Sequence, residues 1–168
     1  MNRRPRVVST PKQQGFHVIE FTETVQIDAS VERVWRALTV PAEVVQWDSG
    51  IVEPIDAPPD YPQPGQHVRW RYRLGPVPLI LHDRPTEVLQ NSTLRSSIEL
   101  GLFSFDETYR LHSPESSTTL LSARLTVSSN LPAIGVLLER VAGAPLARTT
   151  VRTSLRAIKR HCESLAAE

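Results

Sequence analysis

The sequence contains a single cysteine, Cys162, and lacks long apolar runs. One cysteine cannot form an intramolecular disulfide or a cysteine-rich zinc site. No stretch approaches the roughly 18 apolar residues that a helix needs to cross a bilayer, so we expect no stable membrane insertion. The 5 histidines are scattered, without a His/His or His/Glu pair at helical spacing. We therefore expect no metal site and no cofactor.

Neither sign of charge dominates the 168-residue chain, which carries 19 Lys and Arg against 18 Asp and Glu. A dedicated nucleic-acid-binding domain usually shows a basic excess, so we expect no nucleic-acid partner. A hydrophobic fraction of 40% excludes a largely disordered chain. The length suits one compact domain that can bury a sufficient core without a disulfide or a metal ion.

The N-terminal residues are basic and show no periodic pattern. Only Val7 and Val8 follow the first arginines, which is shorter than the apolar stretch of a secretory signal. We therefore expect a cytoplasmic protein with a flexible basic tail over residues 1–16 and a single domain over residues 17–168.

Apolar periodicity predicts the order of the secondary structure elements. Alternation over residues 17–27 predicts a half-buried strand. Two short helices follow, one capped by Ser30 and one opened by Pro41. Alternation between turn residues then predicts further strands at residues 51–56, 66–74, 77–89, 92–103, 104–112 and 117–128.

The C-terminal segment is predicted to be helical. The helix begins at Pro132, is interrupted near Gly143 and Pro145, and resumes with one apolar face formed by Val151, Leu155, Ile158, Cys162 and Leu165. The complete order predicts an α+β fold with a seven-stranded antiparallel sheet. One long helix covers only part of such a sheet, so we expect a cavity between the two.

Three short segments resemble the START/Bet v 1-like (SRPBCC) superfamily. They are Val25-Gln26-Ile27-Asp28-Ala29-Ser30 at the end of the first strand, Val34-Trp35-Arg36-Ala37-Leu38 on the first helix, and the later Trp47. The terminal helix from Leu155 to Glu163 is similar to the amphipathic end of the superfamily. The polyketide cyclase/dehydrase and lipid-transport branch is nearest, because the chain has no Rieske-type Cys/His cluster.

This resemblance covers about residues 17–165 and implies the helix-grip fold. In that fold two short helices follow the first strand, and a long C-terminal helix encloses a cavity against the antiparallel sheet. The resemblance also implies a hydrophobic small-molecule ligand as partner, with the protein a monomer or a homodimer.

Aromatic side chains are the first candidates for the lining of the cavity. By strand alternation Trp70 and Tyr72 share the inward face, and Tyr109 shares a face with apolar neighbours. Trp47 lies beside the short helices that close one end of the cavity. Plain core packing is the alternative for each of them.

Polar residues on apolar strand faces are the second group of candidates. Glu23 and Glu107 have apolar neighbours on the same face, as does Ser96, so each is a candidate to face the cavity. A β-bulge that turns the carboxylate outward, or a hydrogen bond to a Tyr or Ser, is the alternative. His82 is a candidate cavity histidine, with a surface position as its alternative.

These residues support three functional hypotheses. The first is binding, for storage, transport or sensing, of a hydrophobic or amphipathic molecule such as a lipid or polyketide. The second is a polyketide cyclase, aromatase or dehydratase that uses the same cavity, with a cavity acid or base in place of a cofactor. The third is a protein-interaction module that uses the sheet edge or the arginine stripe Arg69, Arg71 and Arg73.

Overall fold

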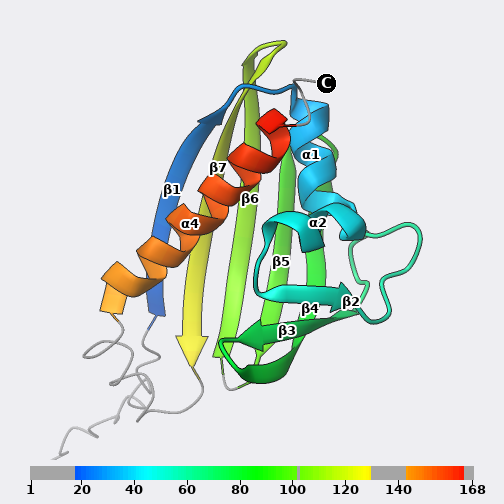
Figure 1. Ribbon diagram of the computed structural model, residues 1–168, viewed down its shortest axis with the longest axis vertical. Coiled ribbons are helices and arrows are strands. Elements are labelled where there is room, and N and C mark those ends of the chain that lie inside the picture. Colours follow the sequence, from blue (N-terminus) through cyan, green and yellow to red (C-terminus); the bar gives the residue numbers. More distant parts are fainter. Residues whose placement is uncertain (1–17, 102, 130–142, 165–168) are drawn as a thin grey trace, which may run out of the picture.

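A computed structural model describes residues 18–101, 103–129 and 143–164 (Figure 1). Its elements are β1 (Val18–Ile27), α1 (Val31–Thr39), α2 (Pro41–Trp47), β2 (Ile51–Pro54), β3 (Val68–Leu74), β4 (Val77–Leu89), β5 (Thr93–Leu100), β6 (Phe103–Glu115), β7 (Thr118–Ser129) and α4 (Gly143–Ser164). All 7 strands form one antiparallel sheet in the order β1-β7-β6-β5-β4-β3-β2. The expected α+β helix-grip fold is therefore confirmed.

Several predicted boundaries differ from the structure, and two of them do so for a clear local reason. The turn between β5 and β6 lies at Gly101, earlier than the predicted junction, because Gly101 adopts a left-handed φ of 61° that glycine tolerates. Pro145 does not interrupt α4 but lies in its first turn, where a backbone N–H would lack a helical partner in any case. The expected tail over residues 1–16 and the helix start at Pro132 fall outside the described residues.

The terminal helix α4 crosses one side of the curved sheet (Figure 1). It packs mainly against β1 and β7 at one end of the strand order, and it also contacts α1 and α2. Its buried side chains join one core cluster with residues of β1 and β7: Val151, Leu155, Ile158, Cys162, Phe21, Ile27, Leu121 and Val127. The inner faces of β3, β4 and β5 lie beyond the reach of this packing.

A buried ionic group holds the short helices against α4. The Arg33 guanidinium of α1 donates to Glu43 of α2 at 2.5 Å, and His161 of α4 lies 3.2 Å from the same carboxylate. Burial raises the pKa of Glu43, but these two hydrogen bonds and the charge of Arg33 outweigh it and leave the pKa lowered. The indole N–H of Trp47 donates to the Ala37 carbonyl at 2.7 Å, which ties the end of α2 to α1.

None of the helices in the described ranges is both long and apolar enough to cross a membrane.

The packing of α4 predicts a clear difference between two adjacent residues. Leu155 is 3% exposed, whereas Arg156 is exposed to solvent. Leu155→Ala should lower the free energy of unfolding by about 2–5 kcal/mol, because it removes buried methyl groups and leaves a cavity. Arg156→Ala should change it by less than about 0.5 kcal/mol. Chemical denaturation of both variants measures the difference, and equal effects would contradict this packing.

Candidate functional site

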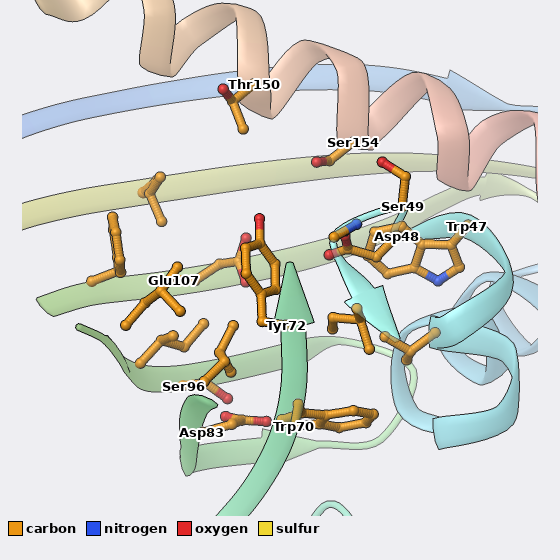
Figure 2. Close-up of a pocket in the computed structure, with 18 of the residues that line it drawn as sticks. Trp47, Asp48, Ser49, Trp70, Tyr72, Asp83, Ser96, Glu107, Thr150 and Ser154 are labelled. Atoms are coloured by element: carbon orange, nitrogen blue, oxygen red, sulfur yellow. The ribbon is translucent and has the colours of Figure 1, made fainter. Parts of the chain in front are cut away.

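A cavity of about 720 Å³ lies between α4, the turn after α2 and the inner faces of β3 to β6 (Figure 2). Its apolar lining comes from the strands and from α1 and α2: Leu38, Val44, Ile51, Leu81, Leu94, Ile98, Leu100, Phe105 and Leu125. Aromatic and polar side chains complete the wall. The volume lies within the range of about 300–1,000 Å³ that is usual for small-molecule sites.

Strand register explains how distant residues meet in this cavity. On β3, Trp70 and Tyr72 point inward, and each faces a leucine of β4 across the strand pair. Ser96 of β5 is the direct partner of Glu107 on β6, so their side chains share one face. Six of the predicted site residues line the cavity together: Trp47, Trp70, Tyr72, Ser96, Glu107 and Tyr109.

The rim of the cavity is formed by the turn after α2 and by Tyr72. The Asp48 carboxylate accepts the backbone N–H of Gly50 at 2.9 Å, which closes the turn into β2. A Cβ on Gly50 would lie 2.4 Å from the Tyr72 ring, so only glycine lets the ring lie flat against this turn. Burial raises the pKa of Asp48, and burial together with the Asp48 charge raises the pKa of Tyr72.

Asp83 of β4 occupies the floor of the cavity and is 6% exposed. The Tyr61 hydroxyl donates to its Oδ2 at 2.7 Å, and the Tyr61 ring packs edge-on against Trp70. Burial raises the pKa of Asp83, while Tyr61, Ser96 and Trp70 oppose the rise. Ser96 and Trp70 lie near the carboxylate (Figure 2), yet neither completes a hydrogen bond to Oδ1, which is buried without a partner.

Glu107 lies deep in the cavity, behind the ring of Tyr72 (Figure 2). Burial raises its pKa from 4.5 to about 7, and the nearby charges of Asp48 and Asp83 act in the same direction. A hydrogen bond with Tyr109 opposes the rise. A pKa of about 7 suits a general acid or base at neutral pH, and the buried carboxyl group is equally a candidate ligand anchor.

Glu23 and His82 lie away from the cavity. Glu23 does share the inner face of β1, but α4 covers that face and its Arg152 forms an ion pair with Glu23 at 3.0 Å. His82 lies on the opposite face of β4 from Asp83, where its ring stacks on His67 and the two rings share a hydrogen bond of 2.9 Å. The structure thus separates these two candidates from the other six.

Several lining residues were missed by the sequence reasoning. Asp83 could have been found, because it alternates with Leu81 on the apolar face of β4, but the interpretation favoured its neighbour His82. Asp48 and Tyr61 lie in connecting segments, where no periodicity indicates direction. On α4 the residues that line the cavity are polar: Thr149, Thr150, Thr153 and Ser154. The sequence pattern predicted only the apolar face of this helix, which begins with Val151 and Leu155, and these polar residues lie beside it.

Within residues 18–101, 103–129 and 143–164, no group of three or more His, Cys, Asp or Glu side chains is placed to hold a metal ion.

The raised pKa of Glu107 predicts a pH-dependent loss of stability. The folded protein holds this proton up to about pH 7, whereas the unfolded chain releases it near the ordinary value of 4.5. The contribution of Glu107 to the free energy of unfolding is therefore fully present below pH 4.5. It is lost as the pH rises from 4.5 through about 7, and the free energy of unfolding falls by on the order of 3 kcal/mol. The groups that face Glu107 are Asp48, Asp83, Tyr61 and Tyr109, and the two aspartates act in the same direction.

Glu107→Gln should flatten this decline, and denaturation curves between pH 4 and 8 would show it. Asp106→Asn is the matched control, because Asp106 is the adjacent residue on the exposed face of β6. Parallel pH profiles for wild type and Glu107→Gln would contradict the placement of Glu107.

Comparison with known proteins places this cavity in a wider context. The family described as polyketide cyclase / dehydrase and lipid transport matches residues 18–163. A search among curated proteins finds no match to the sequence.

Solved structures share the fold at low sequence identity. A START superfamily protein from Mycobacterium smegmatis matches with a TM-score of 0.70 and 19% identity, over 90% of this chain and 99% of that chain. The ginseng major latex-like protein 151 from Panax ginseng matches with a TM-score of 0.66 and 13% identity, over 86% and 97%. A norcoclaurine synthase point mutant from Thalictrum matches with a TM-score of 0.62 and 9% identity, over 89% and 99%.

At these identities the solved structures are evidence for the fold alone, whereas the family model spans both the sheet and the helices that enclose the cavity. The chain therefore belongs to the polyketide cyclase / dehydrase and lipid transport family, and it shares its fold with a START superfamily protein.

Proposed function

We propose that this protein binds a hydrophobic or amphipathic small molecule in the cavity beneath α4. The observation that carries the proposal is the cavity itself, which holds about 720 Å³ in a domain whose core is otherwise well packed. Filling such a space with side chains would stabilise the fold, so the open volume is most simply explained by a ligand.

The lining supports a ligand with an apolar body and one polar end. Aliphatic and aromatic side chains cover the walls, and burying apolar ligand surface there contributes about 25 cal/mol per Å² before the costs of association. The carboxyl groups of Asp83 and Glu107 lie together with Ser96 and are suited to orient the polar end. A filled core would favour a protein-interaction module, because only the surface would then be left for binding. The open cavity favours a small-molecule ligand instead.

Binding can be tested with an uncharged fluorescent probe such as Prodan. We expect a single saturable site, since the apolar walls remove the probe from water and raise its emission. Ser154→Trp should weaken binding at least tenfold, because Ser154 faces the cavity from α4 and an indole there takes up part of the space that the probe needs (Figure 2).

Arg156→Trp is the matched control, since it places the same indole on the exposed side of α4 and should change the affinity by less than about twofold. Equal affinities for wild type and Ser154→Trp would contradict the proposal. Native mass spectrometry of protein purified from its own host would then give the mass of the natural ligand.

A second candidate function is catalysis of a cyclisation or dehydration in the same cavity. The observation that favours it is the pKa of Glu107, about 7, which suits a general acid or base at neutral pH. The cavity would contribute by holding a reactive chain in a folded conformation.

Glu107→Gln separates the two functions. If the molecule recovered from the host is turned over, this variant should lower the rate by about 10²–10⁴-fold while binding survives. Product formation followed by mass spectrometry measures the rate. Unchanged turnover in Glu107→Gln would exclude Glu107 as the acid or base, and binding without any turnover would leave the first function.

A further inference from the structure

The charge of the cavity lining is distinctly acidic. Among the described residues that line it, three carry carboxylates: Asp48, Asp83 and Glu107. Arg73 is the single basic residue in the same lining, and it is exposed to solvent near the end of β3. The side of the cavity formed by α4 contributes hydroxyl groups from threonine and serine. The described residues of the lining therefore supply no buried cation to match these carboxylates.

Asp83 provides an independent indication of a missing hydrogen-bond donor. Its side chain is almost fully buried, and Tyr61 supplies a donor to Oδ2 only. Oδ1 is buried in the cavity floor and accepts no hydrogen bond within the described part of the chain. Buried carboxylate oxygens in folded proteins nearly always have partners, so the Asp83 carboxylate, which lines the cavity, is suited to accept a further donor from a bound molecule.

The aromatic residues of the cavity favour the same sign of charge. Trp47, Trp70 and Tyr72 line the space around the carboxylates, and aromatic ring faces attract cations. A carboxylate or phosphate head group would meet three carboxyl groups and, among the described lining residues, no buried cation. We propose that the ligand carries a protonated amine, which Asp83 and Glu107 bind at the floor of the cavity while its apolar body lies against the aromatic walls.

This inference rests on the proposed binding function and narrows it to cationic amphiphiles. A neutral hydroxyl can also donate to Asp83 Oδ1, but it leaves the carboxylate charges uncompensated. A protonated amine donates to Oδ1 and compensates the charge in one step, and charge-assisted hydrogen bonds are about twice as strong as neutral ones. Amine and alcohol ligands of equal size therefore distinguish the two chemistries.

The test compares three probes that differ only in the polar end. They are 2-(naphthalen-2-yl)ethylamine, 2-(naphthalen-2-yl)ethanol and the carboxylate anion (naphthalen-2-yl)acetate. Each competes with Prodan for the full-length protein at about pH 8. The amine should bind at least tenfold more tightly than the alcohol, and the carboxylate should bind most weakly. At this pH Glu107 is largely ionised, which makes the comparison most sensitive.

Variants then locate the preference within the cavity. Asp83→Asn and Glu107→Gln should each weaken amine binding about tenfold and change alcohol binding by less than about threefold. Asp106→Asn removes the same charge from the exposed face of β6 and should leave all three affinities unchanged. Melting curves identify any variant that does not fold. If Asp83→Asn does not fold, Glu107→Gln alone provides the test.

The outcomes separate this inference from the function on which it rests. Equal affinities for amine and alcohol, or tightest binding of the carboxylate, would overturn the amine assignment and leave cavity binding intact. An amine preference that survives both Asp83→Asn and Glu107→Gln would overturn the proposed subsite. Failure of Prodan and of all three probes to bind the folded wild type would overturn the binding function and the inference together.

Discussion

The central constraint in this molecule is that one helix cannot cover the whole inner face of a curved seven-stranded sheet. Helix α4 buries Leu155 and Ile158 against β1 and β7, and this packing closes the apolar core at one end of the strand order. At the other end of the strand order, β2 and β3 run across the direction of β6 and β7 and lie clear of α4 (Figure 1). Helices α1 and α2 close one end of the remaining space, held by the buried contact between Arg33 and Glu43. The cavity is thus a geometric consequence of the fold, and its chemistry depends on the side chains that face it.

Among those side chains are buried carboxyl groups, which can act on a ligand but reduce the stability of the fold. Burial raises the pKa of both Asp83 and Glu107, because their charged forms lose hydration, and the charge of Asp83 raises the pKa of Glu107 further. Tyr61 and Tyr109 supply hydrogen bonds that offset part of this cost. Buried carboxyl groups that destabilise a fold are commonly retained because they act on a ligand or substrate. In this cavity the proposed binding function and its catalytic alternative would both use the same groups.

The comparisons with known proteins account for the fold of this chain but leave its ligand and any reaction open. Proteins as different as a START superfamily protein, a major latex-like protein and a norcoclaurine synthase share the fold at 9–19% identity. The shared fold does not by itself decide an activity, which depends on the residues of the site. In this chain the cavity is lined by the carboxyl groups of Asp48, Asp83 and Glu107, together with aromatic walls.

The sequence by itself determined the order of the elements and the inward face of most strands. Alternation is a local property, because successive side chains on a strand point to opposite faces, and it placed Trp70, Tyr72 and Glu107 correctly in the cavity. The tertiary structure decided which inward residues meet the cavity and which meet a helix. Glu23 points inward as predicted, but Arg152 pairs with it because α4 crosses the sheet at β1. Asp48 enters the site through a turn whose direction depends on the packing of α2, and no local pattern carries that information.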